Sequence, residues 1–246
     1  MASGDMVSMQ FMQKSSISRN GLKAERSPML KAAPPFKTYP DAQRFNLPEK
    51  SSGFTPQEPD LNKLLKKRRS GRVYSKAPIA FDSLAHIVWA GQGVTAAAGD
   101  RLFRTAPSAG ALYPIETYLS VQNVDTLSPG LYHLDVTNLA LEYLQEGHLG
   151  SQITRACLDQ TFLSQAAVIF IWTAVFMRTL PRYGDRGLRF IFMESAHICQ
   201  NILLAAEAND AWGCPVAAFF DAEMNDILKI DGVHEATIYV AAIGKR

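Results

Sequence analysis

The sequence predicts an α+β sandwich rather than a doubly wound α/β sheet, because strand-like and helix-like segments follow one another without strict alternation. Residues 166–177, AAVIFIWTAVFM, are almost wholly apolar, which is typical of a central strand buried on both faces. Residues 188–209 carry apolar side chains around most of a helix circumference, so this long helix should be buried widely.

Composition divides the chain into two parts. Residues 1–58 are rich in Ser, Pro, Lys and Gln, which predicts an extended or partly disordered N-terminal arm. Residues 59–246 form a single domain that is large enough to bury a core. The arm contains more apolar side chains than a pure linker would have, so part of it should wrap the surface or a partner subunit. These side chains are Met29, Leu30, Phe36, Tyr39 and Phe45.

Local patterns assign the elements of the domain in order. Helices are expected first, at residues 60–69 and 81–90, and a loop of small and polar residues follows at 91–110. The middle of the chain predicts a strand at 116–122, two strands within 130–144 joined near Thr137 and Asn138, a helix at 151–163 and the central strand at 166–175. The long helix at 188–209 precedes two last strands, at 213–220 and 236–244.

Charge and cysteine content exclude several classes of protein. The net charge of +2 gives no general attraction to nucleic acid. The apolar run at 166–177 is shorter than the roughly 20 residues of a membrane-spanning helix, and the N-terminus lacks the apolar core of a secretory signal. Cys157, Cys199 and Cys214 are widely spaced, which predicts neither a disulfide nor a zinc site and favours a reducing cytoplasm.

The densest charge cluster is KKRRSGR, at residues 66–72. Guanidinium groups form bidentate, charge-assisted bonds with phosphate, so a phosphate grip at a helix end is one interpretation. The residues that would form it are Arg68, Arg69, Ser70 and Arg72, with Lys245 and Arg246 of the terminal IGKR as a second arm. The alternatives are a solvated basic patch, a nucleic-acid contact and, for IGKR, a solvated tail.

The stretch RTAPSAGALYPIE, residues 104–116, combines small side chains with two prolines. Small residues let a backbone come close to a flat ligand, and the fixed φ of proline holds its shape. Pro107, Ser108, Ala109 and Gly110 therefore form a candidate surface for a planar ring. A tight turn before a strand is the plainer interpretation.

A third segment, RYGDRG at residues 182–187, precedes the long helix. Tyr183 is a candidate proton donor in a cleft, while a simple loop capped by Asp185 is equally compatible with the sequence. Four polar residues of the helix itself have the spacing to share a face, and they predict a polar seam at a subunit interface: Glu194, His197, Gln200 and Asn201. ESAHICQN is not HExxH, so no metal site is nominated.

The order of these segments is more specific than any one of them. RRSGR, PSAGALYP, RYGDRGLRF leading into ESAHICQN, VAAFFD and IGKR together resemble the nitroreductase-like FMN-dependent oxidoreductases. PSAGALYPIE and RYGDRGLRF are similar to the SagB-type dehydrogenase branch, and FKTYP in the arm is similar too. The resemblance runs from about Asp60 to the C-terminus. It implies a nitroreductase-like sandwich with a mainly antiparallel sheet and an obligate homodimer with FMN at the interface, so that residues 188–209 would be the dimer helix.

The resemblance also implies roles for particular residues. Those of RRSGR would hold the phosphate, ribityl chain and pyrimidine edge of FMN, with Lys245 or Arg246 assisting, and residues 107–110 would lie against the isoalloxazine ring. Hydride would pass through flavin N5 in a ping-pong mechanism, from NADH, NADPH or an organic donor to a small or peptidic acceptor. Arg72 would stabilise the charge of reduced FMN, and Tyr183 beside Arg182 would exchange a proton with the substrate.

Two departures limit what the resemblance implies. Azoline-oxidising SagB-type enzymes have a Lys-Tyr pair that aligns with Arg182 and Tyr183, and arginine is a poor base. Trp212 stands where relatives are richer in glycine, so it would narrow the pocket or change its lid. The alternative functions are an NAD(P)H-dependent reductase of nitroaromatics or quinones and, in another class, a non-catalytic flavin- or RNA-binding module.

Overall fold

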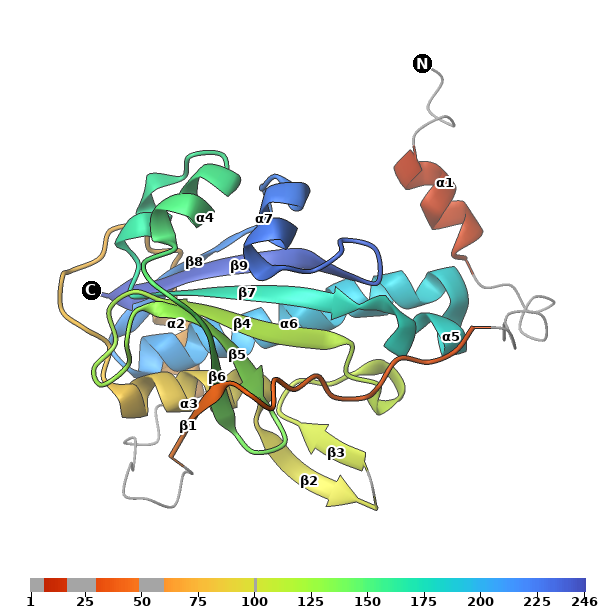
Figure 1. Ribbon diagram of the computed structural model, residues 1–246, viewed down its shortest axis with the longest axis horizontal. Coiled ribbons are helices and arrows are strands. Elements are labelled where there is room, and N and C mark those ends of the chain that lie inside the picture. The colour runs from red at the N-terminus through yellow and green to blue at the C-terminus, as the bar shows by residue number, and fades with distance from the viewer. Residues whose placement is uncertain (1–6, 17–29, 49–59, 100) are drawn as a thin grey trace.

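The core of the protein is a seven-stranded sheet in the order β1-β6-β5-β4-β7-β9-β8 (Figure 1). A computed structural model describes residues 7–16, 30–48, 60–99 and 101–246. Each strand of the sheet is antiparallel to its neighbours. The strands are β1 (Gln43–Asn46), β4 (Ile115–Val121), β5 (Gly130–Asp135), β6 (Ala140–Glu146), β7 (Val168–Val175), β8 (Ala211–Val216) and β9 (Glu235–Lys245). The predicted α+β sandwich with a mainly antiparallel sheet is confirmed.

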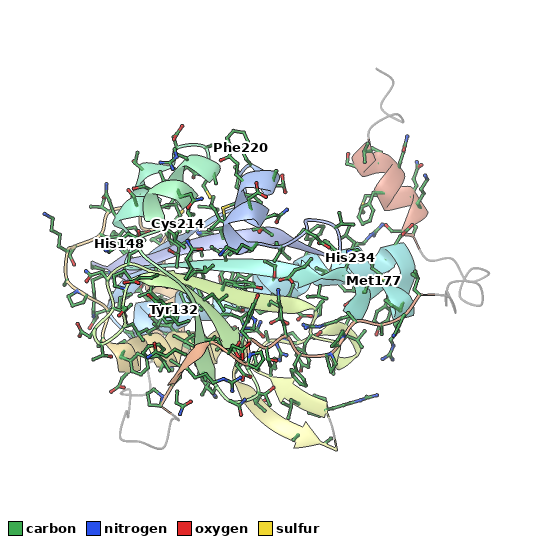
Figure 2. All side chains as sticks on the ribbon, viewed as in Figure 1. Tyr132, His148, Met177, Cys214, Phe220 and His234 are labelled. Carbon is green, nitrogen blue, oxygen red and sulfur yellow. The ribbon has the colours of Figure 1, made fainter. Side chains whose placement is uncertain are left out.

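Helices cover both faces of the sheet. On one face lie α2 (Leu61–Lys67), α3 (Phe81–Gln92) and α6 (Gly187–Ala208), and on the other lie α4 (Gly150–Ala156) and α7 (Asp221–Leu228) (Figure 1). Side chains of alternating strand residues fill the two spaces, Tyr132 in the layer of α3 and α6 and Cys214 in the layer of α4 and α7 (Figure 2). The remaining helical elements are α1 (Val7–Lys14), η2 (Ala109–Ala111), η3 (Thr161–Gln165), η4 (Phe176–Arg178), α5 (Leu180–Tyr183) and η5 (Gly184–Arg186).

The two strongest predictions from the sequence are confirmed. Strand β7 lies inside the sheet between β4 and β9, and seven of its eight residues are buried. Helix α6 is 22 residues long and begins and ends within one residue of the predicted helix. Within the described ranges, no helix has both the length and the apolar character needed to cross a membrane.

Three predicted elements were wrong in part. The loop expected at 91–110 contains a hairpin of β2 (Val94–Ala98) and β3 (Arg101–Arg104), whose alanines and arginines have little strand propensity. The helix expected at 151–163 ends with α4, because Leu158 and Asp159 adopt the left-handed conformation before η3. The strand expected at 213–220 ends with β8, and Asp221 begins α7.

Residues 30–48, which we call the anchored segment, run along the sheet from the end near α5 to β1 (Figure 1, orange). The Lys37 ammonium lies 2.6 Å from the Glu235 carboxylate, and the backbone N–H of Tyr39 donates to Glu142 at 3.0 Å. Part of the arm is therefore fixed to the sheet by polar contacts with one buried acid, Glu142, and one partly buried acid, Glu235. Met29 lies outside the described residues.

Candidate active site

The basic loop after α2 runs beside β8. Ser70 forms a bridge with Gly213, and the Gly71 N–H donates to the Gly213 carbonyl at 3.1 Å. A Cβ at Gly71 would lie 2.1 Å from the Trp212 ring, so only glycine fits there without movement of the indole. Trp212 in turn donates its Nε1–H to the Val73 carbonyl at 3.0 Å. In this chain Trp212 therefore packs the basic loop against β8.

The cations of this loop differ in their surroundings. Arg68 lies near Cys199 of α6, and Arg72 lies 5.8 Å from the Phe162 ring on the other side of the loop. Neither guanidinium has an ion-pair partner in the part of the chain that the structure describes. Arg69 differs, because its guanidinium donates to two backbone carbonyls at the end of α2, at 2.7 and 3.1 Å. Two of the three arginines therefore have no acidic partner, although Arg72 has a side-chain hydrogen bond with Cys214.

The C-terminus reaches the same place. Lys245 donates to the Asn209 carbonyl at 3.0 Å, and Arg246 pairs with the buried carboxylate of Glu207 and lies 5.2 Å from the Trp212 ring. The structure therefore gathers the cations nominated from the sequence, although Arg246 already has a partner. We call this group the basic end: Arg68, Arg69, Ser70, Arg72, Lys245 and Arg246.

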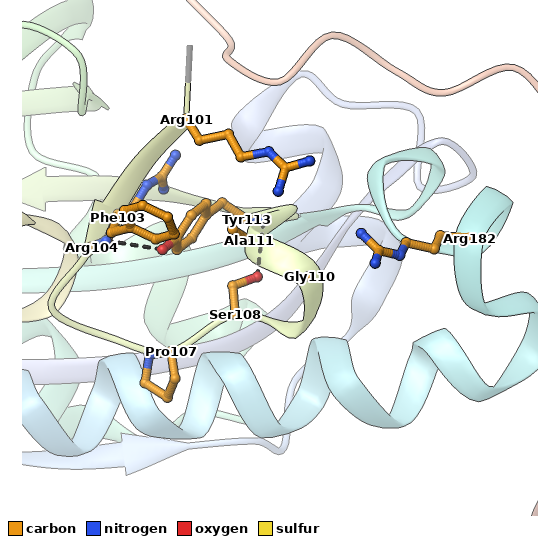
Figure 3. Close-up of a pocket in the computed structure, with 9 residues that line it drawn as sticks. All are labelled: Arg101, Phe103, Arg104, Pro107, Ser108, Gly110, Ala111, Tyr113 and Arg182. Carbon is orange, nitrogen blue, oxygen red and sulfur yellow. Dashed lines mark hydrogen bonds between the residues drawn. The ribbon is translucent and has the colours of Figure 1, made fainter. Parts of the chain in front are cut away.

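The small residues before β4 form a fixed turn. Gly110 has φ of 65°, and a Cβ there would lie 2.7 Å from both Arg182 Nη1 and Tyr183 Oη. Ser108 Oγ accepts from the Tyr113 N–H at 2.9 Å, while the Tyr113 hydroxyl accepts from a backbone N–H of β3 at 3.0 Å (Figure 3). We call residues 107–113 together with Arg182 and Tyr183 the small-residue end.

The predicted catalytic pair lies on α5 and faces this turn. The Arg182 guanidinium lies 5.3 Å from the centroid of the Tyr183 ring, and that ring packs edge-on against Phe190 at 5.1 Å. Gly184, with φ of 54° and ψ of −150°, ends α5 in a conformation that favours glycine. The packing of Tyr183 against Phe190 fixes its hydroxyl beside Gly110.

Arg178 is an important residue that the sequence analysis missed. Its buried guanidinium pairs with Glu116 at 2.6 Å and donates to the carbonyls of Pro34 at 2.6 Å and Tyr113 at 3.1 Å. It therefore joins the anchored segment, strand β4 and the small-residue end. A single arginine directly after a buried strand was the only signal in the sequence.

Behind this arginine lies a second missed group, a buried histidine between two acids. His133 Nε2 lies 3.0 Å from Glu116 and its Nδ1 lies 2.9 Å from Glu142. Burial lowers the pKa of His133, but the hydrogen bonds to both carboxylates outweigh burial and raise it. Burial raises the pKa of each acid, but the bond from His133 and nearby cations lower both below their usual range. The two carboxylates therefore favour the charged form of the imidazole.

Glu194 does not lie where the sequence analysis placed it. Its side chain is buried beneath the small-residue end, whereas His197 and Gln200 are exposed, so the predicted polar seam does not include it. Burial raises the pKa of Glu194 to about 7, although a hydrogen bond with Ser108 opposes the shift. Among the described atoms, Glu194 Oε1 has no hydrogen-bond partner.

This burial predicts a pH-dependent loss of stability. The unfolded chain ionises Glu194 near 4.5 and the folded chain near 7, so stability falls as the pH rises through this window. E194Q should remove the loss and be more stable than the wild type at pH 8 by up to about 3 kcal/mol, with little difference at pH 4. Urea unfolding at both pH values tests this, with the exposed Glu223 replaced in a control, E223Q. Parallel pH profiles for E194Q and wild type would contradict it.

The two ends lie far apart in one chain. The basic end lies beside Gly213, and pairing runs from Gly213 through Ile243 and Val168 to Val121, where β4 ends. The small-residue end directly precedes Ile115, where β4 begins. The length of β4 therefore separates the ends by about 20 Å. Figure 1 shows the same separation, with the C-terminus and α5 at opposite ends of the sheet.

This fold and these two groups define an α+β protein with a cationic grip and a small-residue surface at opposite ends of a sheet. Residues 65–245 match the family model described as "Nitroreductase family", and the chain belongs to this family of oxidoreductases. It is 37% identical over 174 residues to MJ1384, a nitroreductase homologue from Methanocaldococcus jannaschii, covering 71% of this chain and 86% of the relative.

Two further proteins are similar to this chain, one in sequence and one in fold. The Microcin B17-processing protein McbC of Escherichia coli is 28% identical over 151 residues, which cover 57% of this chain and 54% of McbC. A nitroreductase-like crystal structure from Anabaena variabilis superposes with a TM-score of 0.76 at 27% identity, covering 95% of this chain and 45% of that one. This chain thus spans about half the length of both proteins. These comparisons confirm the resemblance to nitroreductases and their SagB-like relatives.

Proposed function

We propose that the protein is an FMN-dependent oxidoreductase in which two chains complete each site. The observation that carries the proposal is the separation of the basic end from the small-residue end within one chain. A single FMN cannot contact both ends of the same sheet through a packed core. In a homodimer, one FMN can contact both kinds of end if the basic end of one chain lies beside the small-residue end of its partner.

Helix α6 has the length and surface for such a dimer. Its 22 residues extend about 33 Å, from the small-residue end at Gly187 to the basic end near Ala208. Phe192 and Met193 are 47% and 55% exposed, an unusual state for large apolar side chains in the middle of a helix. Two copies of α6 packed antiparallel through this face would bring unlike ends together.

The residues of both ends fit FMN. Arg68, Ser70 and Arg72 offer donors for the phosphate and the pyrimidine edge, while Arg69 holds the end of α2 and the C-terminal cations add positive charge. The turn at 107–110 offers a surface with little side-chain bulk for the ring. When bound, FMN supplies hydride transfer to and from its N5 atom, with NADH or NADPH as donor. Tyr183 would donate or accept the substrate proton, and Arg182 would hold charge beside it.

The substrate class separates two candidates within this chemistry. Similarity to McbC supports a SagB-type dehydrogenase acting on a small or peptidic substrate. Arg182 in place of lysine favours the second candidate, a reductase of nitroaromatics or quinones, because such a reaction needs no dedicated base at this position. Free, buried cysteines at 157, 199 and 214 support a reducing cytoplasm as the location.

Complementation between defective chains tests the shared site. One chain carries R68A and R72A, which remove the phosphate donors, and the other carries A109L, which fills the space for the ring. Each homodimer should lose FMN, whereas a hybrid dimer, purified through two different tags, should retain about half of the wild-type flavin in its one intact site. Flavin absorbance per chain measures this. A hybrid without flavin would show that each site belongs to one chain and would overturn the shared-site proposal.

A further inference from the structure

A cavity of about 440 Å³ opens beside the small-residue end (Figure 3). It lies between the β2–β3 hairpin, the turn at 107–113 and α5, and its volume is within the usual range for small-molecule sites. Its nine lining residues are Arg101, Phe103, Arg104, Pro107, Ser108, Gly110, Ala111, Tyr113 and Arg182. The lining contains three arginines and no acid, so the cavity is strongly cationic.

The three guanidinium groups are not equivalent. Arg104 is buried, donates to Gln92 at 3.0 Å and lies 4.5 Å from the Tyr113 ring. Arg101 and Arg182 are exposed, have no ion-pair partner in the ranges that the structure describes, and point toward the same open space (Figure 3). Two unpaired guanidiniums that face one cavity repel each other until an anion lies between them.

We propose that Arg101 and Arg182 bind the anionic group of the molecule that reacts at this end, a carboxylate or a phosphate on a planar body. This inference rests on the proposed function and specifies its substrate class. The guanidiniums bind the anion in charge-assisted pairs, and Phe103 and Tyr113 offer aromatic surface to the planar body. The anion belongs either to the organic substrate or to the 2′-phosphate of NADPH.

The hairpin is the part of the structure that makes this site specific. Arg101 begins β3 and pairs with Ala98 of β2, and the hairpin is separate from the main sheet. Pro35 of the anchored segment lines a smaller cavity of about 90 Å³ that Arg101 and Arg104 also line. The anchored segment therefore lies close to the hairpin, and its Phe36 ring is 5.9 Å from the Arg104 guanidinium. The charge of the cavity depends on Arg101, which lies outside every motif shared with the family.

Matched neutral and charged probes test the inference. We expect benzoate to bind the flavin-loaded protein about 10-fold more tightly than benzamide, measured by calorimetry, and 4-nitrobenzoate to have a correspondingly lower KM than 4-nitrobenzamide. R101Q should abolish this preference by raising the Kd for benzoate and the KM for 4-nitrobenzoate toward the values of the neutral probes. R155Q, which removes an exposed arginine from α4, is the control, and thermal melting verifies that each variant folds.

The second arm compares NADPH with NADH. If R101Q removes a preference for NADPH and leaves the benzoate preference intact, the anion is the phosphate of the reductant. If it removes the benzoate preference, the anion is the carboxylate of the substrate. Either result supports the anion site, and preferences unchanged in both arms overturn it. The flavin spectrum reports separately on the proposed function, because FMN retention does not depend on these probes.

Discussion

Replacing Arg68 and Arg72 together with alanine should lower the affinity for FMN by at least about 100-fold, because each charge-assisted bond contributes roughly 1.5–3 kcal/mol. Neither arginine has an ion-pair partner among the described residues, so their removal leaves no buried charge behind and should not unfold the chain. Fluorescence titration of the flavin-free protein with FMN measures it, and riboflavin, which lacks the phosphate, should bind wild type and variant with much closer affinities.

The matched control removes the same net charge from α2, the helix that precedes the basic loop. Lys63 and Lys66 are exposed on α2, and K63A/K66A should retain FMN at the wild-type affinity. R69A should have a smaller effect than R68A, because the Arg69 guanidinium is already bonded to backbone carbonyls. Equal losses in K63A/K66A and R68A/R72A would mean that only the general field of the basic end attracts FMN.

Deleting residues 1–48 should destabilise the protein by about 3 kcal/mol, the low end of the cost of breaking a buried ion pair, because Glu142 is buried whereas Lys37, Arg44 and Glu235 are partly exposed. The deletion removes Lys37 and Arg44 and leaves Glu235 and Glu142 without these partners. It also exposes the side of Glu142 on which Tyr39 donates its N–H. The melting temperature should fall by roughly 10 °C.

A chain that begins at Leu30 is the control, because it keeps the anchored segment and loses only what precedes it. It should melt close to the full chain, since the hydrogen bonds from α1 and Ser15 to the rest of the described protein are made with the partly exposed Arg186 and Arg189. The deficit of the longer deletion should shrink as the pH falls through the usual range of a carboxyl. The lowered pKa of Glu142 contributes stability only above that range, and its hydrogen bonds from His133 and Tyr39 outweigh the effect of burial. Equal melting of both truncated chains would contradict this prediction.

The sequence predicted the parts of the fold that depend on local pattern. Strand β7 and helix α6 are long and almost uniformly apolar, so periodicity alone located them. The β2–β3 hairpin was not predicted because its two strands pair only with each other and contain mostly alanine and arginine. Helix α7 was not predicted because the apolar run before it has no feature that marks where β8 ends.

For the candidate site too, the sequence predicted the residues that belong to local motifs and did not predict those that depend on long-range contacts. Segments with unusual composition, RRSGR and PSAGALYP, were nominated from the sequence, and the structure gathers each into one group. Arg178, Glu116 and His133 were not nominated, because their partners lie far along the chain. Lys37 and Glu235 are separated by 198 positions, and no local pattern joins such a pair. Ion pairs between single charged residues that lie far apart in the chain therefore could not be predicted from the sequence.

The three bonds of Arg178 give the molecule a mechanical property. One guanidinium binds Pro34, Glu116 and Tyr113. Displacement of the chain near Pro34 is therefore coupled through Arg178 to Tyr113 in the lining of the cavity.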